Sequence, residues 1–402
     1  MQGIRIQNLF GHFNYEIILS EDGMTIITGP NGFGKSTIIQ CLNALANSDV
    51  EYFFKLDFRE IEILSENKDN NLLIINDGHS LVIGGNAILR HELRYMKRVS
   101  PRSHGVDLRK YDEEMKEKMQ GYRGILKKMT QAVGEIRYIK EQRLIIEDAR
   151  ERIRRAGTVE YQREFELVQA VGTIPGKLKS QIERASVTYS DVANELDSTY
   201  PERLFAEQEG IDKQDFDSKI KGMQEKVEKL SKYGISSIKR LNHIEFKEED
   251  ARALKIYFED FDRKYREYSS LIEKLDMFTD IVNRRFCFKK VEISNESGVE
   301  AIDESGGNID LQKLSSGEQE TLVLFYQLLF EVPDQVLLLV DEPEISLHVA
   351  WQRMFIEDLR MIAERKCGKV IVATHSPQIV NGNREIQRDL GEMYKNGLNQ
   401  GI

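Results

Sequence analysis

The sequence predicts an α/β fold in which mixed and parallel sheets with flanking helices carry an inserted, short coiled-coil arm. A β-branched stretch, a Gly-rich turn and an apolar helix follow one another between residues 24 and 45. A wholly apolar run at 336–340 has the composition of a central parallel strand that is buried on both faces. Between these two features, apolar residues recur at heptad spacing, which indicates packed helices.

The length of the chain suggests two or three domains, because it has 402 residues. We expect an N-terminal lobe at 1–143 with a helical insertion near 86–134, a helical arm at 144–284 and a C-terminal lobe at 285–402. Charged residues make up 31% and hydrophobic residues 40% of the chain, which is typical of a soluble globular protein with an unusually charged portion.

Charge and hydropathy exclude some classes of partner. The net charge of −10 argues against attraction of the whole surface to nucleic acid, although a local basic groove stays open. No apolar run approaches the roughly 18 residues of a membrane span, and the N-terminus lacks the pattern of a signal peptide. We therefore expect a cytoplasmic protein with no membrane partner. The three scattered cysteines, Cys41, Cys287 and Cys367, are expected to be buried small hydrophobes.

The N-terminal lobe is predicted to be rich in strands. Alternating or β-branched runs predict strands at 4–10, 15–19, 24–28, 60–64, 72–75 and 80–83. Helices are expected at 38–45 and 111–131, and a further strand at 135–140.

Residues 29–37 match the pattern G-x-x-x-x-G-K-[ST]. The glycines, Gly32 and Gly34 among them, allow the backbone N–H groups to curl around a polyphosphate above the positive end of the following helix. Lys35 is expected to reach the β- and γ-phosphates, and the hydroxyl of Ser36 to bind Mg²⁺. The alternative is a chance Gly-rich turn, but strand and helix are both where a phosphate loop needs them. The phosphate-binding residues predicted from this motif are Asn31, Gly32, Gly34, Lys35, Ser36 and Thr37.

The middle of the chain carries three heptad series, at 178–196, 216–230 and 254–275. Gly234 lies between the last two and suggests the turn of an antiparallel hairpin. A helix of ~20 residues spans only ~30 Å, so we expect a stubby arm with an internal apolar seam.

A basic cluster precedes the arm. Either it contacts nucleic acid or phosphate, or it is a solvated helix face. Its members are Arg90, His91, Arg94, Lys97, Arg98 and Arg102, with Tyr95 among them.

The C-terminal lobe, which begins near 285 with a strand at 286–293, supplies further candidate residues. The apolar run at 336–340 ends in Asp341, which is suited to the Mg²⁺ shell, and Glu342, which is suited to activating water. An exposed acidic turn is the alternative. A strand at 369–374 ends in His375, a candidate sensor of the γ-phosphate. Upstream, a helix at 320–330 follows hydroxyls and a glycine that suit an anion, namely Ser315, Ser316, Gly317 and Glu318.

The order of phosphate loop, Ser-Ser-Gly-Glu signature, apolar strand with Asp-Glu and strand-terminal His resembles the ABC-type ATPase head of SMC, RecF and OLD-like proteins. The resemblance covers roughly 1–83, 136–144 and 286–381. It implies ATP and Mg²⁺ as ligands and a homodimer or larger homo-oligomer, in which the signature of one copy caps the ATP of another. It also implies that Gln142 is the loop glutamine at the Mg²⁺ and that residues 344–348 cross the dimer seam.

The signature departs from the transporter form Leu-Ser-Gly-Gly-Gln at Ser316 and Glu318, which favours the non-transporter branch. Within that branch the phrases at 196–201, 342–348 and 374–378 resemble compact ATPases of bacterial anti-phage systems of the Septu, retron-associated and PARIS types. The tail at 383–402 is too short for the TOPRIM domain of OLD nucleases, so a separately encoded effector is expected to cut any nucleic acid.

The expected function is thus an ATPase, slow in turnover, that dimerises on ATP and controls such an effector. Three alternatives remain open from the sequence. They are a DNA-binding repair or chromosome-maintenance factor that uses the basic cluster, a nucleotide-gated scaffold that does not hydrolyse ATP, and a transporter subunit.

Overall fold

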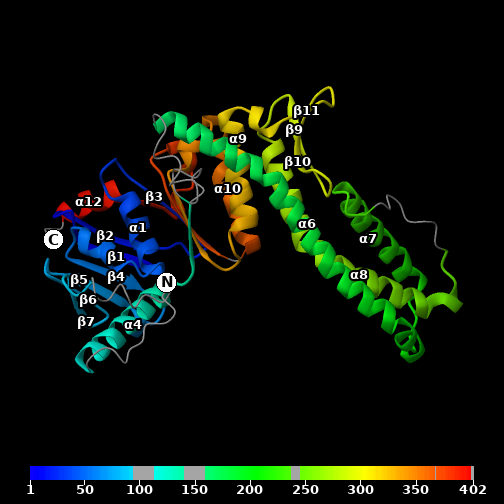
Figure 1. The fold of residues 1–402 in the computed structure, drawn as a ribbon, viewed down its shortest axis with the longest axis horizontal. Helices are drawn as coiled ribbons and strands as arrows, with labels where there is room; N and C mark the ends of the chain where they lie inside the picture. The colour runs from blue at the N-terminus through cyan, green and yellow to red at the C-terminus, as the bar shows by residue number, and fades with distance from the viewer. Residues whose placement is uncertain (94–112, 140–158, 237–244, 367, 400–402) are drawn as a thin grey trace. The chain divides into compact units, whose positions relative to one another are not determined.

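The computed structural model describes residues 1–93, 113–139, 159–236, 245–366 and 368–399 (Figure 1). Contacts divide the chain into two units: Met1–Arg143 together with Val332–Ile402, and Leu144–Glu331. The fold class predicted from the sequence is confirmed, since the first unit contains a mixed set of sheets with flanking helices and the second is mainly helical. The three-part division of the chain stays a prediction.

Sheet A of the first unit is antiparallel, and its strand order is β2-β1-β4-β5-β6-β7. Five of its strands lie where the sequence predicts them. The sixth, β7, was not predicted, because only Ile88 of its residues faces the core and no alternation of apolar residues marks it. The strands are β1 (Gly3–Leu9), β2 (Phe13–Ile18), β4 (Glu60–Leu64), β5 (Leu72–Asn76), β6 (Ser80–Ile83) and β7 (Asn86–Leu89).

Sheet B is parallel throughout, in the order β14-β3-β13-β12-β8. Every residue of β3 and β12 is buried, which confirms the central parallel strand predicted from the apolar run at 336–340. Since all five strands point the same way, their carboxyl ends share one edge of the sheet, where α/β proteins bind ligands. The strands are β3 (Met24–Thr28), β8 (Ile136–Ile139), β12 (Leu337–Asp341), β13 (Lys369–Ala373) and β14 (Gln387–Asp389).

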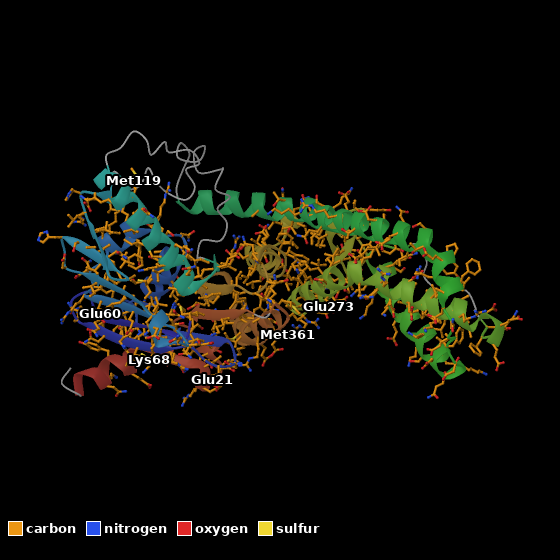
Figure 2. All side chains as sticks on the ribbon, turned by 90° about the horizontal axis from the view of Figure 1, so that it is seen from below. Glu21, Glu60, Lys68, Met119, Glu273 and Met361 are labelled. Carbon is orange, nitrogen blue, oxygen red and sulfur yellow. The ribbon has the colours of Figure 1, made fainter. Side chains whose placement is uncertain are left out.

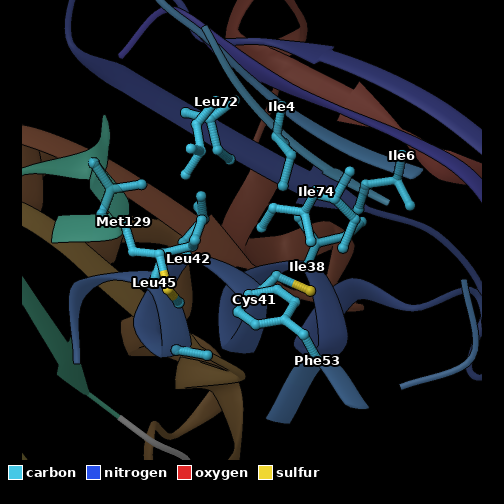
Figure 3. Packing of buried hydrophobic residues seen from close by; sticks show 14 of the residues in the cluster. Ile4, Ile6, Ile38, Cys41, Leu42, Leu45, Phe53, Leu72, Ile74 and Met129 are labelled. Atoms are coloured by element: carbon cyan, nitrogen blue, oxygen red, sulfur yellow. The ribbon is translucent and has the colours of Figure 1, made fainter. Parts of the chain in front are cut away.

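The core of the first unit forms where α1 packs against sheet A (Figure 3). Ile38, Cys41, Leu42 and Leu45 follow the 3.6-residue period of a helix and lie on one face of α1, which explains why that face is buried. Phe53 from α2 and Met129 from α4 complete the cluster, in which Cys41 is buried as expected. The α-helices in the described part of this unit are α1 (Lys35–Ala46), α2 (Val50–Lys55), α4 (Glu113–Val133), α10 (Val349–Lys366), α11 (Pro377–Val380) and α12 (Leu390–Asn399).

The second unit contains the helices α6 (Val159–Ala206), α7 (Lys213–Lys232), α8 (Ala251–Asn283) and α9 (Ser316–Tyr326), and sheet C, which is antiparallel. Figure 2 shows the side chains along α6 and α8, with the exposed Glu273 on α8. The strands of sheet C are β9 (Lys289–Ser294), β10 (Gly298–Asp303) and β11 (Asn308–Ile309).

The expectation of a stubby arm built from helices of ~20 residues is wrong. Helix α6 has 48 residues and α8 has 33, so the contour of α6 is about 70 Å at 1.5 Å per residue. This length was not predicted from the sequence, because α6 contains Pro175 and Pro201 and proline ordinarily ends a helix. The helix bends along its length instead of stopping (Figure 1).

Sheet C lies close to α6 at Pro175. A Cβ on Gly298, whose φ is +74°, would come 2.1 Å from the carbonyl oxygen of Pro175, so only glycine fits there. The strand expected at 286–293 begins three residues late, at Lys289. Cys287, which precedes it, is exposed, and the expectation of a buried thiol is therefore wrong at this position. Cys367 lies outside the described residues.

Within the described ranges, no helix has the length and apolar character needed to span a membrane.

Candidate active site

The Gly-rich loop joins the end of β3 to the start of α1. Gly29, Gly32 and Gly34 have φ values of +147°, +85° and +88°, a region that residues with a side chain rarely adopt. A Cβ on Gly34 would also lie 2.9 Å from Leu9 Cδ2 in β1. The loop conformation thus depends on glycine at these places, as the motif predicts.

Lys35, the first residue of α1, turns its ammonium group back over the loop. Its Nζ donates to the carbonyl oxygens of Gly29, at 2.9 Å, and Pro30, at 3.2 Å, and the residue is only 5% exposed. Tyr15 in β2 donates its hydroxyl to the carbonyl oxygen of Phe33, at 2.9 Å, and so fixes the loop from the other side. A positive charge therefore lies inside a turn of fixed shape.

Ser36 and the buried Asp341 meet at the carboxyl edge of sheet B. Ser36 Oγ donates to Asp341 Oδ1 at 3.0 Å, and the Tyr138 hydroxyl donates to Oδ2 at 3.0 Å. Burial raises the pKa of Asp341 above its ordinary value, although the hydrogen bonds from Tyr138 and Ser36 oppose the shift, and the charge of Glu344 adds to it. The carboxylate is thus poised for a compensating cation.

Glu342 follows Asp341 in a left-handed conformation, with φ +45° and ψ +55°. Such a backbone is costly for a residue with a side chain and is often found at functional sites. Its N–H donates to the carbonyl oxygen of Ala373 at 2.9 Å, so the end of β12 stays joined to β13. Its carboxylate lies 3.8 Å from His375 Nδ1.

Glu344 is the carboxylate nearest to His375, with Oε1 at 3.0 Å from Nδ1. It lies in a short 3₁₀ turn, Pro343–Ser346, directly after Glu342. Gln352 on α10 joins this turn to the residue after the histidine. Its Nε2 donates to the carbonyl oxygens of Leu347, at 3.0 Å, and Glu344, at 3.3 Å, while its Oε1 accepts from Ser376 Oγ at 2.7 Å.

A cleft of about 960 Å³ opens beside the loop, and Asn31, Phe33 and His375 are among the residues that line it. Residues of β14 and α12, including Asp389, also line it. Asp389 accepts from Thr28 Oγ1 at 3.0 Å, which ties β14 to the strand that enters the loop. A ligand on the loop thus has space next to it.

The signature residues lie in the second unit, at the N-terminus of α9. Ser315 and Ser316 are exposed, and the N-terminus of a helix suits an anion. Glu318 instead points inward. Its Oε2 accepts from Ser315 N at 2.9 Å, Ser315 Oγ at 2.8 Å and Lys289 Nζ at 3.1 Å, so it caps the helix. A nucleotide contact by Glu318 stays a prediction.

The structure brings together five of the predicted residues at the carboxyl edge of sheet B: Lys35, Ser36, Asp341, Glu342 and His375. Asn31, Gly32, Gly34 and Thr37 lie in or directly after the same loop. Gln142 lies outside the described residues, so its role stays a prediction. Three residues that the sequence did not single out for this site belong to it: Tyr138, Glu344 and Gln352.

The oxygen donors of this site fit Mg²⁺, because the Ser36 hydroxyl and the Asp341 carboxylate are hard ligands 3.0 Å apart. No group of three or more His, Cys, Asp or Glu side chains in the described part of the chain could hold a metal ion by itself. One or two protein ligands, completed by phosphate and water, are typical of Mg²⁺ at nucleotide sites.

A model of the AAA ATPase domain matches residues 1–380. Similar solved structures include the Smc head bound to the C-winged helix domain of ScpA, with 14% identity over 95% of this chain and 91% of that chain and a TM-score of 0.38. They also include the SMC head domain from Thermotoga maritima, with 13% identity over 96% of this chain and 93% of that chain and a TM-score of 0.35. At these TM-scores the similarities carry no argument about this chain. No curated protein matches the sequence.

Proposed function

Because the chain belongs to the AAA ATPase domain family, we propose that it hydrolyses ATP, that two copies close around the nucleotide, and that turnover controls a separately encoded effector. The effector is a nuclease, and the setting is bacterial defence against phage. Hydrolysis is supported by the site geometry, pairing by the exposed signature, and effector control by the resemblance of the motifs.

One observation carries the hydrolysis: the Ser36 hydroxyl meets the Asp341 carboxylate at 3.0 Å beside a lysine-bearing glycine loop. The loop N–H groups and Lys35 bind the phosphates, as their positions at the start of α1 allow. Ser36 and Asp341 would hold Mg²⁺, which would neutralise charge on the phosphate oxygens. Asp341 suits such an ion because burial disfavours its ionised form, a cost that a bound cation would offset.

Glu342 is the general base. Its side chain is 21% exposed at the end of β12, so it reaches solvent without being freely mobile. It accepts the proton of a water whose oxygen bonds to the γ-phosphorus, while the bond from that phosphorus to the bridging oxygen breaks and ADP leaves with the electron pair. His375, whose side chain is 47% exposed, donates from Nε2 to the γ-phosphate when its ring is doubly protonated.

Pairing of two copies follows from the signature. The exposed hydroxyl of Ser316 and the backbone N–H of Gly317 lie at the N-terminus of α9, a combination that suits the γ-phosphate held by another copy. The site of each copy is then complete only when the two heads meet, which makes hydrolysis slow and dependent on assembly. A change of assembly on ATP is the signal that the effector detects.

The test is the mass in solution of Glu342→Gln, with and without Mg-ATP. This variant retains the nucleotide but lacks the base, so ATP is expected to increase its mass to about twice that of the monomer. Adding Ser316→Arg is expected to abolish the increase, since a bulky cation then occupies the capping surface. The matched control is Ser218→Arg on the exposed face of α7, which should leave the increase intact. A mass that does not respond to ATP contradicts pairing through the signature.

The competing DNA-binding function depends on the basic cluster, of which residues 94–102 lie outside the described residues. Arg90 is engaged in the fold, because its Nη2 donates to the carbonyl oxygen of Phe54 at 2.8 Å. DNA binding would appear as an affinity that falls steeply with salt. Absence of binding at low salt removes this alternative.

A further inference from the structure

We propose that Glu344 is a positioning residue that fixes the orientation and the protonated nitrogen of His375. The inference rests on the proposed ATPase activity, in which His375 contacts the γ-phosphate. Glu344, two positions after the general base Glu342, then has a task in the reaction and is more than a structural part of its turn.

The donors that surround Glu344 converge on one oxygen. Oε1 accepts from Thr374 Oγ1 at 2.7 Å and from the backbone N–H of His375 at 2.8 Å, and it lies 3.0 Å from His375 Nδ1. The backbone and the ring of the same histidine are thus held by a single atom. Rotation of the ring away from this position would break the shortest contact that its Nδ1 makes with a carboxylate.

The neighbouring hydrogen bonds indicate which atom carries the hydrogen in the 3.0 Å contact between Glu344 and His375. Ser376 N donates to Thr374 Oγ1 at 3.0 Å, so the threonine hydroxyl is free to donate onward to Glu344. Because Oε1 also accepts from a backbone N–H, it acts as an acceptor, and Nδ1 carries the hydrogen in its contact with Glu344. Neutral His375 then presents Nε2 as its other, unprotonated nitrogen, and protonated His375 presents Nε2 as a donor.

The burial of Glu344 argues against a purely structural role. The residue is 8% exposed, and among the described residues its second oxygen, Oε2, is buried without a hydrogen-bond partner. A buried carboxylate that leaves one oxygen unsatisfied is costly and calls for an explanation. Stability alone would favour a side chain that satisfies all its polar atoms, whereas an anion facing the imidazole favours one orientation of the ring.

Glu342 is the other carboxylate near the ring, but it lies at 3.8 Å from Nδ1, too far for a direct hydrogen bond. Of the two carboxylates, Glu344 is therefore the one that holds the histidine by a direct contact. Gln352 links Glu344 to the residue after His375, because its side chain hydrogen-bonds both the carbonyl of Glu344 and the hydroxyl of Ser376.

The first test is steady-state ATP hydrolysis by Glu344→Gln and Glu344→Ala, with the exposed Glu357→Gln on α10 as the matched control. Gln retains an oxygen acceptor without the charge, so its kcat is expected to fall about 10-fold, and that of Ala about 100-fold, as for other carboxylates that orient a histidine. KM for ATP should change little, since Glu344 touches no phosphate. When Glu344→Ala is added to the His375→Ala variant, kcat should not fall further. An equal loss of kcat in both backgrounds overturns the inference.

The second test does not depend on activity. Long-range ¹H–¹⁵N spectra of protein labelled at its seven histidines, with His375 assigned by its loss in His375→Ala, report which ring nitrogen carries the hydrogen. Wild type and Glu344→Gln should show the Nδ1–H form of the neutral ring, and Glu344→Ala a mixture. An Nε2–H ring in wild type overturns the inference. If the wild type does not hydrolyse ATP but shows the Nδ1–H ring, the proposed function fails while the positioning by Glu344 stands.

Discussion

Ser36 and Asp341 are 305 positions apart in the chain and share a hydrogen bond of 3.0 Å at the edge of sheet B. The contact joins the start of α1 to the end of β12. It places one hydroxyl and one buried carboxylate where a nucleotide-bound Mg²⁺ needs them. Tyr138 occupies the second oxygen of the carboxylate, so Asp341 has no freedom to turn away.

Asp341→Asn is expected to lower ATP turnover at least 100-fold and to raise the Mg²⁺ concentration needed for the residual activity, because the amide is a poor cation ligand. Hydrolysis measured against Mg²⁺ concentration checks this, and EDTA should abolish activity of the wild type. The control is Asp57→Asn, an exposed carboxylate of the same unit. Turnover in Asp341→Asn with an unchanged Mg²⁺ requirement would show that Asp341 does not hold the metal.

Tyr138→Phe tests the electrostatics of the same carboxylate. Burial raises the pKa of Asp341, and the Tyr138 hydroxyl opposes the shift by hydrogen-bonding the ionised form. Its removal raises the pKa further, so Asp341 is protonated, and unable to bind Mg²⁺, at higher pH than in wild type. The acid limb of kcat/KM for Mg-ATP should therefore move to higher pH, with little change near the optimum. An unmoved or oppositely moved limb contradicts this account.

Much of this site follows from the sequence, because its parts carry local signals. The apolar residues of β3 and β12 predict buried parallel strands, and parallel strands bring their carboxyl ends to one edge. The meeting of Ser36 with Asp341 is thus a consequence of two short sequence motifs that each follow a buried strand.

Other features had no such signal. Tyr138 reaches Asp341 only because β8 pairs with β12 in one particular register, which no local pattern encodes. Glu344 is visible as a third acid after Asp341 and Glu342, but its turn toward His375 depends on tertiary structure. The length of α6 was not predicted, because a proline such as Pro175 normally ends a helix. In the structure, packing of α6 against α8 and α9 outweighs the cost of Pro175 within the helix.

Gly32→Ala separates backbone strain from ligand contact. Gly32 and Gly78 have φ values of +85° and +88°, and a Cβ on either would meet nothing within 4 Å. Alanine should therefore cost about 1 kcal/mol of unfolding free energy at both places. Only Gly32→Ala should weaken ATP binding, since only Gly32 lies in the proposed phosphate loop. Nucleotide titration and urea unfolding of both variants check this, and equal affinities would show that the loop does not approach the phosphates closely.

Glu318→Gln should make the stability of the chain less dependent on pH in the acid range. Burial opposes ionisation of Glu318, but hydrogen bonds from Ser315 and Lys289 outweigh it and hold its pKa below the ordinary value of 4.5. The ionised cap therefore stabilises the fold above pH 4.5, and this contribution is lost as pH falls through the lowered pKa. The free energy of unfolding of the wild type should exceed that of Glu318→Gln by about 1 kcal/mol at neutral pH. In acid the two values should converge. Parallel pH dependences, measured by urea unfolding, would contradict the role as a cap.

Arg203 and Asp260 join α6 to α8 near the end of the arm. Arg203 Nη1 lies 2.5 Å from Asp260 Oδ1 and Nη2 lies 2.7 Å from Oδ2, while Nη2 also donates to the carbonyl oxygen of Leu196 at 2.8 Å. Asp260 is 7% exposed, so removal of the guanidinium leaves a buried charge without its partner. Arg203→Ala should therefore lower the free energy of unfolding by about 3 kcal/mol.

The double variant Arg203→Met with Asp260→Leu should recover most of that loss, because two apolar side chains fill the same space and leave no charge behind. Urea unfolding of both variants, read by far-ultraviolet circular dichroism, checks the prediction. The control is Lys226→Ala, which removes a more exposed ion pair with Asp262 and should cost less than about 1 kcal/mol. If Arg203→Ala lowers the free energy of unfolding no more than Lys226→Ala does, the Arg203–Asp260 pair does not hold α6 and α8 together. The apolar residues between the two helices then do so alone.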